Sequence, residues 1–295
     1  MTEPRACPRR SAGRQVLCAL LAVALVAPLA AKESKEKRRE KEGAAEPAKK
    51  PARPEIRSFD TETLSALGRQ IYRHDSLAWI ATDVLFAKVS QETVAAEGGA
   101  GWIVDTSGEA PVVRFVREVE ERIEAAYDVV FPKEGKPHVV VPERRELSTA
   151  QLGAYRSYRT AIGALIERQS PWCGGTPNHV ELPDPDGSGF LVYILRPKPA
   201  ADVVPIGGHY RITVSADGGT VEQVDQLFAS CLTLPRKAEG SDGKEIVALS
   251  MSHIDSPTPL ETHVFLSLQE KLPFMLITEG GQMWSVEHGV ITKAN

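Results

Sequence analysis

HYRITVSADGGTV, residues 209–221, is the stretch that decides the fold class of this chain. Apolar and polar side chains alternate strictly along its first part, with Tyr210, Ile212 and Val214 on one side and His209, Arg211, Thr213 and Ser215 on the other. Strict alternation predicts a β-strand with one covered face and one solvated polar face. Asp217-Gly218 then predicts a tight turn into a second strand. The stretch therefore indicates an antiparallel sheet with one buried side.

More extended segments lie on both sides of this stretch. From their β-branched and aromatic residues and their flanking turn residues, we expect strands at 79–88, 101–116, 124–131, 138–141, 260–269 and 273–291. Ser107-Gly108 divides 101–116 into a hairpin, and Gly280-Gly281 divides 273–291 in the same way. Most of the folded chain is therefore predicted to be β-structure.

Two helices are predicted to cover these sheets. The first is expected to have Asp60 or Thr61 as its cap and places apolar residues on one face, namely Leu64, Leu67 and Ile71. The second covers 149–169, with Ser148 and Gln151 as a capping box and Pro171 after its end. Its apolar face is predicted to contain Leu152, Tyr155, Ile162, Leu165 and Ile166.

The predicted fold class is α+β, with antiparallel sheets covered by a few helices. Each helix precedes a group of strands, so the order of elements allows two helix-plus-sheet halves. We place an N-terminal α+β module at 58–140 and a C-terminal α+β module at 148–295.

The amino terminus has the pattern of a secretory signal peptide, which we assign to residues 1–31. A basic start is followed by an uninterrupted apolar run from Val16 to Ala31, with cleavage expected at Ala30 or Ala31. The run has 16 residues, fewer than the roughly 20 that a membrane-spanning helix needs. The sequence therefore predicts an exported protein, periplasmic or secreted. The alternative is a protein anchored by an uncleaved N-terminal segment.

Residues 32–57 are predicted to be a disordered, charged linker. They contain ten basic and six acidic residues and no aromatic residue, so they bury too little apolar surface to fold. Residues 58–295, in contrast, carry 21 basic and 32 acidic side chains. An acidic body of this kind argues against a nucleic-acid partner. Membrane contact is expected only if the N-terminal segment stays uncleaved or the basic linker binds lipid.

The two cysteines outside the leader, Cys173 and Cys231, are predicted to form a disulfide, because thiols of exported proteins meet an oxidising compartment. A thioredoxin-type motif would need a cysteine where Thr176 stands. The acidic segment 184–189 is predicted to be a hairpin turn, because the twelfth position of a calcium loop is Leu195 rather than an acid.

No pattern of metal ligands, nucleophile or cofactor-binding glycines stands out, so we predict no metal or cofactor site. His209, Glu261 and His263 are the candidate catalytic residues, because neighbouring strands would bring them together on a polar sheet face. A solvated outer face without chemistry is the competing interpretation of the same residues.

Four short segments carry a resemblance to exported bacterial proteins of no assigned function: GGHYR at 207–211, VSADG at 214–218, SCL at 230–232 and ETHVF at 261–265. A helix against a curled antiparallel sheet is also similar in shape to modules of the PepSY or cystatin kind. The resemblance implies a strand-and-turn fold and no particular chemistry.

The sequence thus favours an exported envelope protein that acts as a non-catalytic binding or accessory module. Its expected partner is a protein or a cell-envelope component. The alternative is a hydrolase-like enzyme that uses His209, Glu261 and His263 on a sheet face.

Overall fold

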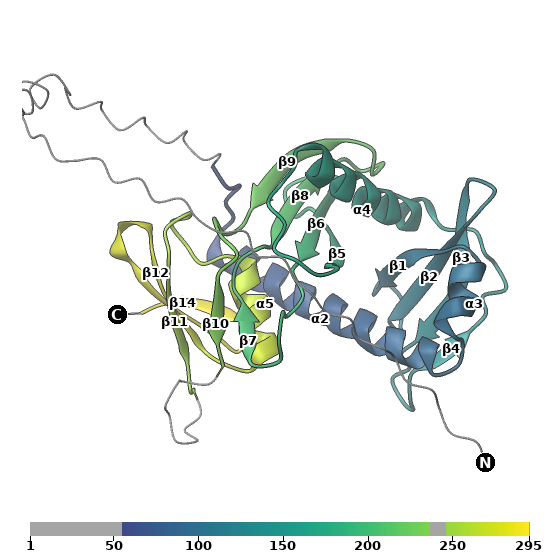
Figure 1. Ribbon diagram of the computed structural model, residues 1–295, viewed down its shortest axis with the longest axis horizontal. Coiled ribbons are helices and arrows are strands. Elements are labelled where there is room, and N and C mark those ends of the chain that lie inside the picture. Colours follow the sequence, from purple (N-terminus) through teal and green to yellow (C-terminus); the bar gives the residue numbers. More distant parts are fainter. Residues whose placement is uncertain (1–54, 237–245, 295) are drawn as a thin grey trace, which may run out of the picture. The chain divides into compact units, whose positions relative to one another are not determined.

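The computed structural model describes residues 55–236 and 246–294 of the chain (Figure 1). Its fold is α+β, as the sequence predicts, with three four-stranded sheets and one two-stranded sheet. The predicted signal peptide, its cleavage site at Ala30 or Ala31, and most of the predicted linker lie outside the described residues.

Helix α2 (Thr61–Phe86) begins where the sequence predicts, because the Asp60 side chain accepts a hydrogen bond from the backbone N–H of Thr63 at 2.7 Å. The strand predicted at 79–88 is wrong, since α2 continues through it. Ala78, Ala81 and Leu85 are buried at helical spacing and extend the apolar face.

Sheet β1-β2-β3-β4 is an antiparallel meander. Its first hairpin turns around Ser107-Gly108, as predicted. The end of α2 packs on this sheet through a cluster of Ala81 and Leu85 with Val113, Phe115 and Val129. The short helix α3 (Gln91–Ala96) leads from α2 into the sheet, whose strands are β1 (Gly99–Asp105), β2 (Val112–Val119), β3 (Arg122–Val130) and β4 (His138–Val140).

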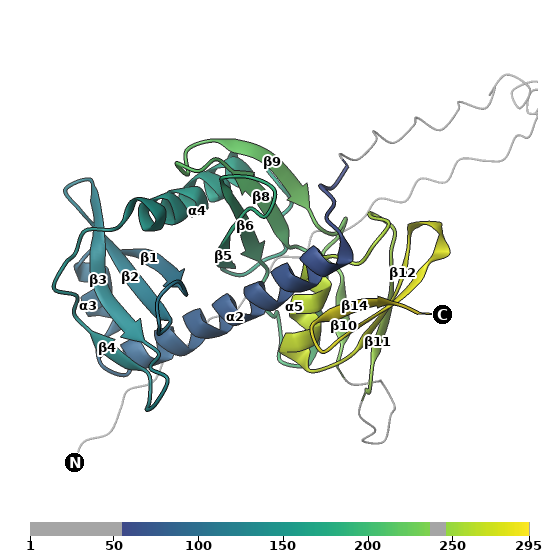
Figure 2. The ribbon, with the colours of Figure 1, turned by 180° about the vertical axis from the view of Figure 1, so that it is seen from behind.

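Helix α4 (Thr149–Glu167) carries the predicted capping box between Ser148 and Gln151. It covers one face of the antiparallel sheet β5-β6-β8-β9 through Ala161 and Leu165. Figure 2 shows this sheet between α4 and α2. Its strands are β5 (Asn178–Pro183), β6 (Phe190–Leu195), β8 (Tyr210–Val214) and β9 (Val221–Gln226).

Both faces of β8 are buried, so the predicted solvated polar face is wrong. Tyr210, Ile212 and Val214 pack toward α4, as the alternation predicts. Arg211 and Thr213, on the other face, are also buried. That second face is covered because Leu191, Tyr193 and other residues of β6 share a core with α2 and the C-terminal elements.

The last sheet, β11-β12-β13-β14, contains a parallel pair, because helix α5 carries the chain from β11 back to the start of β12. The strand predicted at 260–269 is therefore wrong. Residues 261–267 of α5 are all buried, which removes the one-sided pattern that marks a surface helix. The elements are β11 (Leu249–His253), α5 (Glu261–Glu270), β12 (Phe274–Thr278), β13 (Met283–Glu287) and β14 (Val290–Lys293).

Helix α2 also packs against α5 and the last sheet, in the core that β6 shares with the C-terminal elements. Gly68 lets it approach α5 closely, because a Cβ atom at this position would lie 2.4 Å from the Cβ of Val264. The two-stranded sheet of β7 (Val203–Pro205) and β10 (Thr233–Pro235) lies in the segments that flank β8 and β9. Helix α2 packs on elements of both predicted modules, because its first half shares a core with the segment 148–295 and its second half forms a separate cluster with β2 and β3.

Candidate functional site

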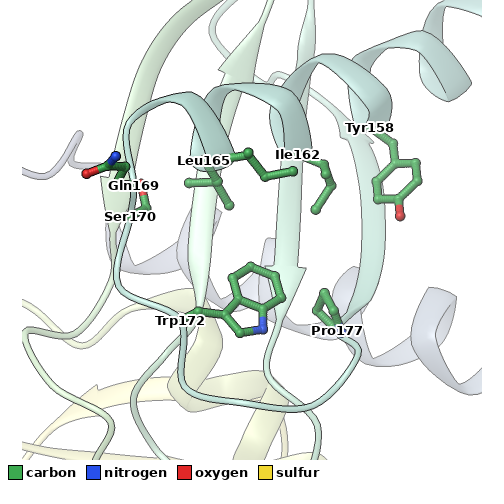
Figure 3. Close-up of a pocket in the computed structure, with 8 residues that line it drawn as sticks. Tyr158, Ile162, Leu165, Gln169, Ser170, Trp172 and Pro177 are labelled. Carbon is green, nitrogen blue, oxygen red and sulfur yellow. The ribbon is translucent and has the colours of Figure 1, made fainter.

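The C-terminal half of α4 forms one wall of an open groove of about 460 Å³ (Figure 3). The opposite wall is the loop that leads from α4 to β5, and Figure 3 shows Trp172 and Pro177 facing the helix across the groove. None of the residues that line the groove carries a charge. They are Tyr158, Ile162, Leu165, Ile166, Gln169, Ser170, Trp172 and Pro177.

Two large apolar side chains of this groove face solvent. Ile166 is 71% exposed and Trp172 is 48% exposed. The helical pattern places Ile166 on the same apolar face as Leu165, but only Leu165 reaches the sheet, where it is 3% exposed. Neighbouring exposed apolar side chains that line a hollow are typical of binding sites. Ile166 is therefore better explained by the groove than by the core.

The loop wall of the groove is held in place by the disulfide between Cys173 and Cys231, whose Cα atoms are 5.5 Å apart. This confirms the predicted pairing. The loop is also held at its start, where the hydroxyl of Tyr210 donates to the carbonyl of Pro171 at 2.6 Å. Gly208 lies directly behind the disulfide with φ of +96°, and a Cβ atom there would come within 2.7 Å of the Cys173 sulfur. The position consequently requires glycine.

A histidine–carboxylate pair supports Tyr158, which lies at the end of the groove away from Gln169 and Ser170 (Figure 3). Nδ1 of His179 lies 2.6 Å from a carboxylate oxygen of Glu181. The His179 ring is stacked between Tyr158 and Trp102, with centroid distances of 3.7 and 4.2 Å. Both ring faces are covered and the residue is 3% exposed, so the pair is suited to positioning Tyr158 rather than to proton transfer with a bound substrate.

Sequence reasoning missed this pair, although a signal is present. His179 and Glu181 are two residues apart on β5, and residues at this spacing point to the same face of a strand. Only the tertiary structure shows that α4 and β1 supply the two aromatic rings around the imidazole.

The three predicted catalytic residues are buried in the interior of the protein. His209, Glu261 and His263 are 1%, 0% and 2% exposed. Both ring nitrogens of His209 have main-chain partners. Its Nδ1 accepts a hydrogen bond from the N–H of Arg196, and its Nε2 lies 2.6 Å from the carbonyl oxygen of Pro205. His263 accepts from the N–H of Leu260 through Nδ1 at 2.9 Å. None of the three lines the groove.

Glu261 instead belongs to a buried charge network centred on Arg211. The Arg211 guanidinium donates to Glu261 at 2.7 Å and to Asp225 at 2.8 and 3.0 Å. It also donates to the main-chain carbonyl of Arg57 and lies over the ring of Phe59. Burial by itself lowers the pKa of Arg211, but Glu261 and the other neighbours outweigh it and raise that pKa above the usual range.

The acidic stretch 184–189 is a hairpin turn between β5 and β6, as predicted. Arg57 donates to both carboxylate oxygens of Asp184, at 2.6 and 2.8 Å, and to Asp186 at 3.3 Å. These ion pairs correct the predicted linker boundary. Ile56 is buried and Arg57 is bound, so both belong to the folded part rather than to the linker.

Buried histidines make the fold sensitive to acid. Burial lowers the pKa of His74 and of His209 to about 4. Burial, together with the charges of His253 and His209, also holds the pKa of His263 well below its usual range. In the unfolded chain each would titrate near pH 6.5. Between these values the unfolded state binds more protons, so stability is complete above pH 6.5 and decreases as the pH falls toward 4.

We expect the free energy of unfolding to fall by about 1.4 kcal/mol per pH unit for each such histidine within this window. Urea unfolding at pH 7, 6, 5 and 4.5 measures the slope. The variant His209→Gln removes one of these groups and should flatten the slope by about one such increment. An unchanged slope in the variant would show that His209 is not protonated on unfolding.

No helix in the described ranges is long and apolar enough to cross a membrane. Comparison of the chain with known protein families, with curated proteins and with solved structures finds no match.

Proposed function

We propose that this protein is an exported, non-catalytic binding module whose ligand site is the groove along α4. The observation that carries the proposal is the open, uncharged groove with Ile166 and Trp172 exposed in its walls. Its volume of about 460 Å³ is typical of small-molecule sites, which are mostly apolar with a few polar groups. An uncharged groove of this kind suits an apolar ligand. Because the protein is proposed to be exported, the proposed ligand is an apolar component of the cell envelope.

The energy available to such a ligand comes from apolar surface that the fold leaves exposed. A tryptophan side chain offers about 150–250 Å² of surface, so covering the exposed half of Trp172 removes roughly 100 Å² from water. At about 25 cal/mol per Å² this contributes about 2–3 kcal/mol, before any contribution of Ile166.

Export is supported by the basic and apolar pattern of residues 1–31, which lie outside the described part of the chain. The disulfide is compatible with it, because such bonds persist in oxidising compartments. The hydrolase alternative has weaker support, because Glu261 is bound to Arg211 and His209 is bound to main-chain groups.

Replacing Ile166 with aspartate tests the groove. The carboxylate places a charge in an apolar wall, so we expect at least a tenfold loss of affinity for a neutral solvatochromic dye such as Nile red. Fluorescence titration measures the dissociation constant. The matched control is Ile254→Asp, because Ile254 is equally exposed at 73% but does not line the groove. Equal affinities of the two variants would contradict the proposed site.

A further inference from the structure

The loop between β7 and β8, residues 206–209, lies directly behind the disulfide that holds one wall of the groove. Gly208 belongs to this loop and lies against the disulfide itself. The Arg196 guanidinium joins the two, because it donates to the main-chain carbonyl of Gly207 at 3.2 Å and to that of Cys231 at 3.0 Å. Any movement of the β7–β8 loop is therefore transmitted to the wall of the groove.

His209 holds the β7–β8 loop in place through both nitrogens of its ring. Nδ1 accepts from the N–H of Arg196 at 3.1 Å, so the neutral ring carries its proton on Nε2 and donates it to the carbonyl of Pro205 at 2.6 Å. A second proton would have to bind at Nδ1, where it would point at the N–H of Arg196. Two donors would then face each other in a buried place, so the closed loop does not accommodate the charged ring.

The ionisable groups that face the His209 ring are bases, so they do not offset the charge of an imidazolium. Arg196 faces it from the segment after β6, and His263 faces it from α5. His253 of β11 lies against His263, with ring centroids 4.8 Å apart. The contacts with β7 and with the residue after β9 are made by main-chain groups. Burial lowers the pKa of His209 to about 4, the charge of Arg196 acts in the same direction, and the carbonyl of Pro205 opposes them only in part.

We propose that His209 is an acid-sensitive switch: protonation of its ring releases the β7–β8 loop and loosens the disulfide wall, so that the groove loses its ligand at low pH. The inference rests on the proposed function of the groove. In the open loop the ring meets water and titrates near pH 6.5, whereas in the closed loop its pKa is about 4. The open form therefore binds the proton more tightly, and the closed form is fully favoured only above pH 6.5. Between pH 7 and pH 4.5 these values raise the equilibrium constant for opening by roughly 60-fold.

Amide hydrogen exchange of the disulfide-bonded protein, followed by NMR at pH 7, 6, 5 and 4.5, tests the switch. We expect the protection factor of the Arg196 N–H, which donates to His209, to fall by roughly 60-fold over this range. In His209→Gln, whose side chain stays uncharged, it should change less than twofold. His263→Gln is the matched control, because it removes another buried histidine that accepts from a main-chain N–H and should leave the response of Arg196 in place. The N–H of Ile71, in the buried face of α2, reports global unfolding and should stay better protected at every pH.

Nile red titration at pH 7 and pH 4.5 then connects the loop to the groove. Affinity follows the closed fraction, so we expect binding at least twofold weaker at pH 4.5 in the unmodified protein and equal binding at both pH values in His209→Gln. Protection of Arg196 that is independent of pH or equal to that of Ile71, or Nile red affinity that is unchanged at pH 4.5, would overturn the inference and leave the groove in place. Failure to bind Nile red at either pH, with the expected response of Arg196, would instead overturn the proposed function of the groove. If His209→Gln does not fold, the comparison of Arg196 with Ile71 in the unmodified protein still decides whether the loop opens locally.

Discussion

Replacing Arg211 with methionine is expected to lower the free energy of unfolding by about 3–5 kcal/mol. Arg211 is fully buried and forms ion pairs with Asp225 and Glu261, which are also buried. The substitution preserves much of the side-chain volume but leaves two carboxylates in the core without their cation. The cost arises mainly from these unpaired charges rather than from the loss of attraction itself.

Guanidinium unfolding at pH 7 with the disulfide intact measures this effect. Arg117→Met is the matched control, because the Arg117–Glu124 pair has the same chemistry but is partly exposed, and partly exposed pairs contribute up to about 1 kcal/mol. The triple variant Arg211→Met, Asp225→Asn and Glu261→Gln should recover part of the stability, because it removes the buried charges together. A loss of less than 1 kcal/mol for Arg211→Met would contradict the role of the network.

Removing the disulfide with the double variant Cys173→Ala and Cys231→Ala should cost about 4 kcal/mol of unfolding free energy. The bond closes a loop with a sequence separation of 58 residues, and a loop of that length restricts the unfolded chain by about this amount. Guanidinium unfolding measures the difference. The unmodified protein treated with dithiothreitol is the control and should unfold at the same denaturant concentration as the double variant.

The same double variant also reports on the groove. Cys173 lies in the loop that forms one wall, next to Trp172, so loss of the bond should weaken Nile red binding as well as stability. If the variant has the stability and affinity of the unmodified protein, other contacts must hold the loop, and the hydrogen bond from Tyr210 to Pro171 is then the first to test.

Features that depend on neighbouring residues along the chain agree with prediction. The capping box of Ser148 and Gln151, the cap at Asp60, and the hairpin turns at Ser107-Gly108 and 184–189 all form as expected. In each of these the side chain or turn residue acts on backbone groups a few positions away, so the interaction is encoded in a short stretch of sequence.

Predictions that required knowledge of what covers a segment were less successful. Residues 79–88 and 260–269 were expected as strands and belong to α2 and α5. The polar residues Arg211 and Glu261 were expected on a sheet face and are joined in the core, between β8 and α5. Charged side chains are usually exposed, so a sequence read without knowledge of their partners places them at the surface. A matched ion pair can nevertheless be buried.

The sequence by itself determined the α+β class, the starts of α2 and α4, several turns and the disulfide partners of this protein. Tertiary structure alone decided that both faces of β8 are covered, and that Ile166 and Trp172 meet across a groove instead of entering a core. The physical reason is that propensity, capping and turn chemistry act over a few residues. Burial, ion pairing and groove shape depend on segments brought together by packing from distant parts of the chain.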